Sequence, residues 1–262
     1  MGDKTRIDWC DATINPVIGC SRGCEYCYAR KMNARWKWVE DFGVPQFFPA
    51  ALEQPYKWKG PRIIFVCSLG ELFDPLVPTA WTHRVFAMME DNPQHRFMVL
   101  TKRYEEMQDW FGVLPANMWM GFSVTDSRSM ERSLALNELP YGRQRFLSIE
   151  PLLGPLWPDD KPGLCFGAYL PDHLSWIIIG AQTNPNVQPK RVWVQEILNA
   201  ADDAGIPVLM KHNLEWPGKR RFEFPLELEK IRSIWWRGRA RPGTARLGKA
   251  RPGKARQGKV KR

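Results

Sequence analysis

The chain has 262 residues, with 38 Lys and Arg against 28 Asp and Glu, for a formal charge of +10. This charge is concentrated at one end: residues 237–262 contain seven Arg, four Lys and no acid, whereas the first 236 residues have a net charge of −1. No apolar run approaches the roughly 18 residues of a membrane span, and the N-terminus lacks the apolar core of a secretory signal. With 44% apolar residues, the composition excludes wholly disordered proteins, and we expect a cytoplasmic protein with one sizeable core.

Short apolar runs recur along the chain and predict β-strands. Each run is almost continuously apolar, which is typical of strands covered on both faces in a parallel sheet. A first strand over Ala12–Gly19 is expected to be irregular or at an edge because it contains Pro16. The other runs are Ile63–Cys67, Phe97–Thr101, Met118–Val124, Arg145–Ile149, Trp176–Gly180 and Pro207–Met210.

Segments with helical spacing lie between the strands, which start 21 to 34 residues apart, about one βα unit. In the first, Thr79 is a possible N-cap, and Val85, Met88 and Met89 share one face. We therefore expect an α/β body over residues 1–236 with six or seven βα units, and favour a partial or closed TIM-like barrel over an open doubly wound sheet. The predicted helices are Thr79–Met89, Arg128–Leu139, Val192–Ala204 and Leu226–Trp236.

Two segments do not fit this rhythm. The stretch Pro151–Ser175 has five Pro and three Gly, so we expect an ordered excursion or lid between two strands. Residues 237–262 form an Arg/Lys/Gly repeat with a period of five, which we expect to be disordered. This tail is either an arm that adds affinity for nucleic acid without sequence preference or a repeat expansion without a selected role.

The six cysteines fall into two groups. In a reducing compartment, clustered thiols indicate a metal site or catalysis rather than disulfides. The clustered ones are Cys20, Cys24 and Cys27, whereas Cys10, Cys67 and Cys165 lie in apolar surroundings and are expected to be small buried hydrophobes.

The Cys-x3-Cys-x2-Cys segment offers three thiolates from one short loop, in which Gly19 and Gly23 permit tight turns. Electron-transfer clusters normally use four cysteines, so three would leave one iron of a cubane cluster open to a ligand. Zinc is the alternative, with a fourth ligand from Cys10, Cys67 or a histidine. Structural zinc sites usually draw on two ligand pairs, and the four histidines of this chain are isolated from one another: His83, His95, His173 and His212.

With Tyr26 directly before the third cysteine, this segment resembles the signature of the radical S-adenosylmethionine (SAM) superfamily. Further strings, which together run from about residue 5 to 216 and exclude the tail, are similar to a phage-associated branch of uncharacterised activity. The chain departs from that branch in the shorter gap between its first two cysteines, and in Gly180–Thr183 (GAQT), where the branch tends to have an acid. The similar strings are Ile7–Cys20, Val99–Arg103, Ser148–Pro155 and Val208–Lys211.

The resemblance implies a [4Fe-4S] cluster on Cys20, Cys24 and Cys27 that reductively cleaves bound SAM to a 5′-deoxyadenosyl radical. It also implies an electron donor such as flavodoxin or ferredoxin, and a nucleic acid or polypeptide as the substrate. The alternative is a zinc- or cluster-stabilised nucleic-acid-binding protein without catalytic turnover.

Polar residues directly follow all six internal apolar runs, where a barrel has its active site. Because loops are polar in general, each such residue is about as easily a solvated loop residue. By resemblance, Tyr26 would contact the adenine of SAM. The methionine end would meet Ser68, Gly70 and Glu71, and the ribose Ser123 and Asp126.

Each of these assignments has a structural alternative. Tyr26 can be a core aromatic, Glu71 a first-turn helix residue and Asp126 a helix cap. The three remaining strand-end charges are candidate catalytic or substrate-binding groups, or partners of one another, because buried ions need partners: Lys102, Glu150 and Lys211.

Three tryptophans near the N-terminus are interleaved with basic residues. This pattern can stack nucleobases, but packing of large side chains beside snorkelling lysines is the favoured interpretation. The tryptophans are Trp36, Trp38 and Trp58, and the basic residues are Arg35, Lys37, Lys57 and Lys59.

Overall fold

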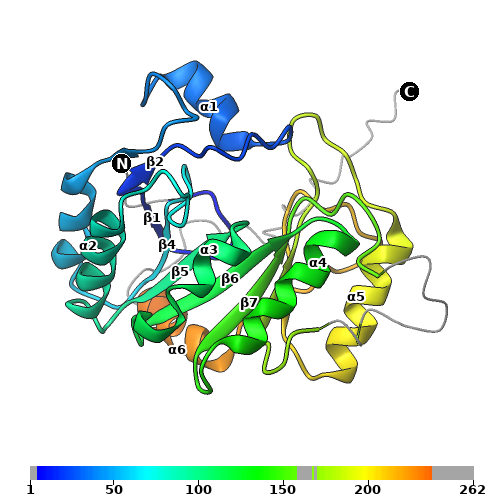
Figure 1. Ribbon diagram of the computed structural model, residues 1–262. Coiled ribbons are helices and arrows are strands. Elements are labelled where there is room, and N and C mark those ends of the chain that lie inside the picture. The colour runs from blue at the N-terminus through cyan, green and yellow to red at the C-terminus, as the bar shows by residue number, and fades with distance from the viewer. Residues whose placement is uncertain (1–4, 158–166, 168–169, 238–262) are drawn as a thin grey trace, which may run out of the picture.

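The computed structural model describes residues 5–157, 167 and 170–237. Its main sheet has seven parallel strands in the order β1-β4-β5-β6-β7-β8-β9 (Figure 1). The strands are β1 Ala12–Ile14, β4 Ile63–Val66, β5 Arg96–Thr101, β6 Met118–Val124, β7 Gln144–Ile149, β8 Trp176–Ile179 and β9 Val208–Met210.

The strand order decides between the expected architectures. Neighbours in the sheet follow one another along the chain, as in a barrel and unlike a doubly wound sheet, whose order reverses. Within the described residues β1 and β9 do not pair with each other. The fold is therefore a parallel half-barrel: the α/β class and the partial barrel are confirmed, and the closed TIM-like barrel is wrong.

All six internal strands lie within one residue of their predicted bounds, because their apolar runs are buried on both faces. The expected irregularity near Pro16 is also confirmed. Strand β1 ends at Ile14, and the chain then forms β2 Val17–Ile18, which pairs antiparallel with β3 Gln46–Phe47. Proline has no N–H for a ladder, so the strand breaks there.

The convex face of the sheet is covered by helices. Helix α2 buries Val85, Met88 and Met89 as predicted, but Thr79 is its first residue and Pro78 occupies the cap position, so the predicted Thr79 cap is wrong. The predicted helix Arg128–Leu139 is an α-helix followed by a 3-10 turn. These elements are α2 Thr79–Glu90, α3 Tyr104–Gln108, α4 Ser127–Ser133, α5 Arg191–Asp203, and the 3-10 turns η1 Pro49–Glu53, η2 Pro55–Lys57, η3 Phe111–Val113 and η4 Leu134–Glu138.

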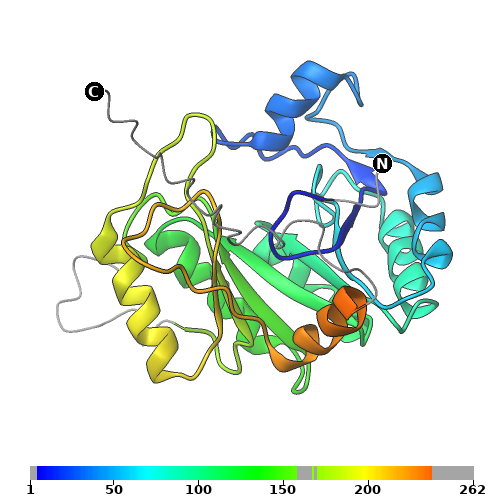
Figure 2. The ribbon, with the colours of Figure 1, turned by 180° about the vertical axis from the view of Figure 1, so that it is seen from behind.

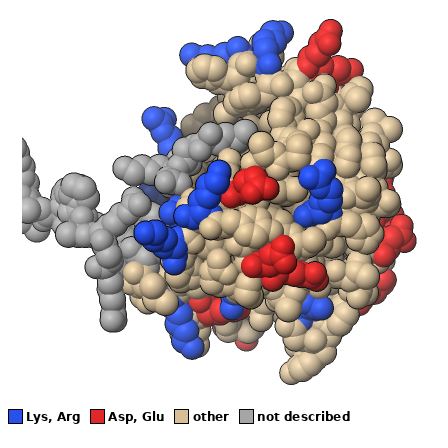
Figure 3. All heavy atoms as spheres, turned by 90° about the vertical axis from the view of Figure 1, so that its left-hand side faces the viewer, with Lys and Arg blue, Asp and Glu red and all other residues tan. Residues whose placement is uncertain are grey.

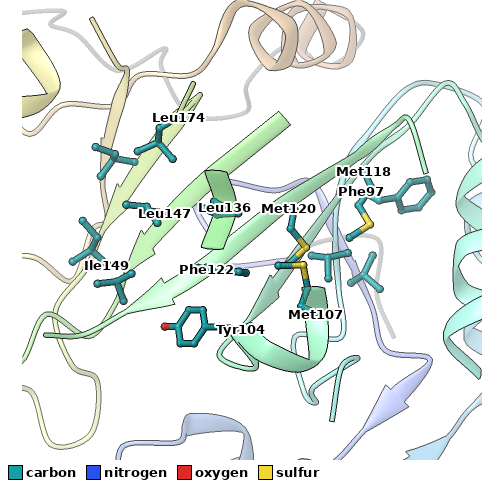
Figure 4. Packing of buried hydrophobic residues seen from close by; sticks show 14 of the residues in the cluster. Phe97, Tyr104, Met107, Met118, Met120, Phe122, Leu136, Leu147, Ile149 and Leu174 are labelled. Carbon is teal, nitrogen blue, oxygen red and sulfur yellow. The ribbon is translucent and has the colours of Figure 1, made fainter. Parts of the chain in front are cut away.

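Figure 4 shows how this layer packs. Met107 of α3 lies against Met120 of β6, and Tyr104 stands beside Phe122 with ring centroids 4.6 Å apart. The hydroxyl of Tyr104 donates to the main-chain oxygen of Ser123 over 2.7 Å. The convex cluster therefore ends in a polar contact at the carboxyl end of β6.

A second apolar cluster fills the concave face. It joins Trp9, Trp119, Phe146 and Trp176 to residues of α6, Leu226–Arg237, which lies against the sheet near its amino end (Figure 2). Aromatic side chains are large enough to fill the hollow of a half-barrel without a second ring of strands. The polar part of the concave side is thereby restricted to its carboxyl end.

Three expectations fall partly or wholly outside the described residues. These are the excursion within Pro151–Ser175, of which 158–166 and 168–169 are not described, the burial of Cys165, and the disordered tail from residue 238. Arg237, which was assigned to the tail, is the last residue of α6. Among the helices described, none has the length and apolarity to cross a bilayer.

Candidate functional site

The three clustered cysteines lie on one loop between β2 and helix α1, Tyr28–Trp36. Cys27 is the N-cap of α1, and its Sγ accepts the N–H of Arg30 at 3.4 Å. The Sγ of Cys20 accepts the N–H of Arg22 at 3.4 Å. All three thiols are half-buried and free of disulfides.

Two glycines join this loop to the end of β4. The N–H of Gly19 donates to Leu69 O, and the N–H of Glu71 donates to Gly19 O, each over 3.1 Å. A Cβ on Gly70 would lie 2.6 Å from Val17 O, a distance that real side chains do not reach. Gly70 is therefore needed for close approach of the two loops, whatever it binds.

A charged cluster that the sequence analysis missed fixes the next residue of the loop. Ser21 donates to Asp74 from its main-chain N–H and from its hydroxyl, each over 2.8 Å to Oδ2. Arg103 donates to the Ser21 hydroxyl over 2.7 Å and faces Asp74 at 3.4 Å. The Asp74 side chain is fully buried, so this carboxylate anchors the cysteine loop to the segment between β4 and α2.

Ser68 is held by Asn15, a second residue that the sequence analysis missed. The Oδ1 of buried Asn15 accepts the Ser68 hydroxyl at 3.1 Å and the N–H of Leu69 at 2.9 Å. The main-chain oxygen of Ser68 accepts the hydroxyl of Tyr28. Ser68 thus connects the end of β1, the end of β4 and the start of α1.

Glu71 is buried directly below the cysteine loop. It accepts hydrogen bonds from the hydroxyl of Thr101 at 2.8 Å and from the N–H of Lys102 at 3.2 Å. Burial raises the pKa of this carboxyl, and the Thr101 and Lys102 contacts oppose that rise. The alternative of a first-turn helix residue is wrong, because α2 begins only at Thr79.

Tyr26 reaches from the cysteine loop towards the ends of β5 and β6. The Nζ of Lys102 lies 4.9 Å from its ring centroid, and Thr125 and Cys24 lie near its hydroxyl. Burial, with Cys24 close by, raises the pKa of Tyr26. Tyr26 is half-buried and belongs to none of the apolar clusters, so the alternative of a core aromatic is wrong.

Ser123 and Asp126 have different environments. Ser123 is buried on the concave side and pairs in register with Ser148 of β7. Asp126 caps α4, since its Oδ1 accepts the N–H of Ser129 at 2.9 Å within a capping box. The alternative that Asp126 is a helix cap is confirmed. A contact of Asp126 with the ribose of SAM stays a prediction.

Glu150 and Lys211, at the ends of β7 and β9, form an ion pair whose side chains are 23% and 15% exposed. A Cβ on Gly180 would lie 2.9 Å from the Glu150 carboxyl carbon, so the carboxylate rests on a bare stretch of main chain. The expectation that strand-end charges are partners is confirmed for this pair. Lys102 is the exception, since it faces Tyr26 and Glu71 instead.

Helix α1 lies beyond the carboxyl edge of the half-barrel, on the side of β1 and β4 (Figure 1). Tyr28 at its start contacts Ser68 after β4, and Lys31 donates to the main-chain oxygen of Asn184 after β8. The structure therefore brings the cysteine loop, Glu71, Lys102 and the Glu150–Lys211 pair to one edge of the sheet.

The charges around the loop bear on whether it suits a metal cluster. Burial, with smaller contributions from Glu71, Asp74 and Cys24, raises the pKa of Cys20 to about 12, and the hydrogen bond from the N–H of Arg22 opposes the rise. Thiols among carboxylates become thiolates when a cationic ligand is present. This donor set of three thiols on one anchored loop fits an iron–sulfur cluster.

A single metal ion fits less well. Tetrahedral zinc with Zn–S bonds of about 2.3 Å needs sulfurs roughly 3.8 Å apart. Among the described residues, no group of three His, Cys, Asp or Glu side chains is arranged to hold one ion. Cys67 is buried in the convex cluster, as predicted, whereas Cys10 is only partly buried against the concave one. Burial raises the pKa of both thiols.

The three tryptophans that lie among basic residues differ in their burial. Trp38 and Trp58 are partly buried against apolar clusters, and Arg62 lies over Trp58 at 4.6 Å, which confirms the packing interpretation for both. Trp36 is 59% exposed at the end of α1. On the face shown in Figure 3, Lys and Arg side chains alternate with Asp and Glu.

Fold and site together define an α/β half-barrel protein with a cysteine loop at the carboxyl edge of its sheet. The chain belongs to the family described as "Protein of unknown function (DUF5131)", whose model matches residues 4–261. That match extends through the Arg/Lys/Gly repeat. Neither a curated protein nor a solved structure matches the chain.

Proposed function

We propose that the protein is an iron–sulfur enzyme of the radical SAM type, with Cys20, Cys24 and Cys27 as the ligands of a [4Fe-4S] cluster. The chemistry that the bound cluster supplies is one-electron reductive cleavage of SAM to a 5′-deoxyadenosyl radical. The observation that carries the proposal is the anchored position of the three thiols over the polar edge of the half-barrel.

The chain's own residues contribute binding and orientation. The loop is fixed through Gly19 and Ser21, which limits the freedom of the main chain that carries the thiols. Glu71 is a carboxyl group beside Cys20 and suits the amino group of a bound amino acid. We propose the ring of Tyr26 as the surface on which the adenine rests.

The Glu150–Lys211 pair joins the ends of β7 and β9 at the same edge of the sheet. We propose that it faces the substrate, where Lys211 holds a proton and Glu150 accepts a hydrogen bond. Ser123 of β6 and Ser148 of β7 lie on the same concave side, where both hydroxyls are buried. Together they make a compact polar patch above an apolar floor, which limits water around a reactive intermediate.

The test is anoxic reconstitution with iron and sulfide, followed by measurement of bound iron, acid-labile sulfide and 5′-deoxyadenosine released from SAM with a reductant. We expect a brown protein that releases 5′-deoxyadenosine. Cys24→Ala should lose iron, whereas the matched variant Cys67→Ala, which removes a buried thiol of the convex cluster, should keep it. Equal iron in the two variants would refute the ligand assignment.

A colourless protein with stoichiometric zinc would instead support the alternative of a nucleic-acid-binding protein without turnover. In that case Cys24→Ala should lose zinc and no SAM should be consumed. The same preparations therefore distinguish the two functions.

A further inference from the structure

Helix α1 has an unusual distribution of side-chain sizes. Its buried residues are the small Ala29 and Asn33, whereas the large Tyr28, Met32 and Trp36 are 45%, 39% and 59% exposed. Met32 and Trp36 are spaced by four and share one face of the helix. An apolar stripe turned towards solvent is typical of a binding surface.

The charge of α1 is equally one-sided. From Tyr28 to Trp36 the helix has Arg30, Lys31 and Arg35 and no acid, and Lys37 follows as its C-cap. Arg30 turns inward to Cys20 O and the ring of Phe42, which leaves the others at the surface. The nearest acids along the chain, Glu25 and Glu40, lie outside the helix on either side.

Aromatic and basic groups also meet directly on this surface. The guanidinium of Arg35 lies over the ring of Trp36 at 5.1 Å. Such a pair presents a flat face and a positive charge together, a combination that suits a stacked base and its phosphate. The hydroxyl of Tyr28 is bound to Ser68 O, so this side chain belongs to the inner side of the helix. We infer that the outer face of α1, made by Met32, Arg35 and Trp36, is a docking surface for single-stranded nucleic acid.

Charge decides between possible occupants of this face. The chain's own residues 238–262 carry ten basic side chains and no acid, so their charge does not complement a basic helix. A phosphodiester strand is complementary in charge, and its bases suit exposed aromatic rings. The inference deepens the proposed function, on which it rests for the chemistry, by naming the substrate class that lies above the cysteine loop.

The first test compares binding of a labelled single strand of about 16 nucleotides with binding of the same sequence as a duplex, using the full chain. Trp36→Ala should weaken single-strand binding about tenfold and leave duplex binding within about twofold, because stacking needs unpaired bases. The matched control Tyr141→Ala removes an aromatic ring that is 89% exposed elsewhere, and should change neither affinity.

The second test isolates the phosphate contact. Arg35→Gln should reduce the slope of log affinity against log salt for the single strand by about 0.7. Arg128→Gln, an exposed arginine of α4, is the matched control and should leave the slope unchanged. An equal slope in both variants would overturn the role of Arg35.

Photo-crosslinking of a strand that contains 5-iodouracil, followed by peptide mapping, locates the contact. Crosslinks at Met32 or Trp36 support the inference, whereas crosslinks confined to residues 238–262 overturn it. Loss of polyglutamate binding in Trp36→Ala without loss of strand binding would assign the face to an acidic polypeptide and also overturn it. None of these readouts requires iron or SAM, so this inference and the proposed function can fail separately.

Discussion

The two ends of the parallel sheet treat buried polar groups in different ways. At the amino end, buried side chains bond to the main chain. Arg145 donates to Leu136 O over 2.7 Å, and Asn117 donates to Met89 O over 2.7 Å. Their partners are the ends of helices and turns on the convex side, so these polar groups fasten connections.

At the carboxyl end, polar groups bond largely to one another. Glu150 pairs with Lys211, Glu71 accepts from Thr101, and Asp74 accepts from Ser21 and faces Arg103. A side chain paired with another side chain can exchange that partner for a ligand. A side chain that donates to buried main-chain oxygens cannot move away without leaving those oxygens unpaired, which destabilises the fold. The identity of the partner therefore separates structural from candidate functional groups.

The largest expected loss of stability comes from a substitution at the amino end of the sheet. Arg145→Met should lower the free energy of unfolding by about 3 to 5 kcal/mol, because it leaves buried carbonyl oxygens without donors. Urea denaturation measures the loss, and Arg128→Met, at an exposed position of α4, should change stability by no more than about 0.5 kcal/mol. A loss below about 1 kcal/mol would show that Arg145 does not fasten these turns.

At the carboxyl end of the sheet we expect smaller losses of stability, with energetic coupling between the paired side chains. Glu150→Gln and Lys211→Met should each cost about 1 to 2 kcal/mol, and the double variant should cost less than the sum by about 1 kcal/mol. The same denaturation experiment measures this cycle. The exposed pair Arg132–Glu105 is the control and should show coupling of about 0.5 kcal/mol or less; additive effects at Glu150 and Lys211 would contradict the comparison.

A pH titration gives a further test of the buried polar groups at the amino end of the sheet. Burial lowers the pKa of His95 below its ordinary 6.5, and its Nδ1 accepts the N–H of Arg62 at 3.1 Å. Below pH 6.5 the unfolded chain binds a proton that the folded protein rejects, so stability should fall as pH drops through that range. The slope is at most about 1.4 kcal/mol per pH unit.

The control for that titration is His95→Gln, in which this part of the pH dependence should be absent between pH 7 and the lowered pKa. Denaturation midpoints at a series of pH values measure the difference between the two proteins. Identical slopes of stability against pH would mean that His95 is protonated in the folded protein as readily as in the unfolded chain. Its Nδ1 would then not be held as an acceptor of the Arg62 N–H.

The smallest effect concerns the contact of Lys102 with Tyr26. Lys102→Met removes the charge over the ring but keeps the main-chain N–H that Glu71 accepts, so we expect a loss of about 0.5 to 1 kcal/mol. Lys190→Met, which removes a similar contact with Trp193 at 5.1 Å, is the matched variant. A cycle with Tyr26→Leu that shows no coupling would rule out the contact.

Local pattern was sufficient to predict the strands. Runs such as Met118–Val124 are apolar on both faces, and only a sheet covered on two sides buries them, so their bounds agree with the structure. Helix starts were less predictable. Thr79 has the residue type of a cap, but Pro78 before it takes that position, and propensity alone does not distinguish neighbouring positions.

The partners of the site residues could not be predicted in the same way. Asp74 anchors Ser21 from 53 positions away, and Asn15 holds Leu69 from 54. Nothing within a window of ten residues marks either side chain, because the contact exists only after β1 and β4 pair. Glu150 and Lys211 were predictable as a pair because both follow strands, whose carboxyl ends must meet at one edge.

The last strand also determines when the protein can acquire its structure during synthesis. Asp8 accepts the main-chain N–H of His212 at 2.9 Å, and Trp9 shares its cluster with Leu228 and Ile231 of α6. Residues made first are thus stabilised by residues made near the end of translation. The segment around Asp8 and Trp9 can pair with β4 early, but it completes its contacts only when residues 204 positions further along the chain have been made.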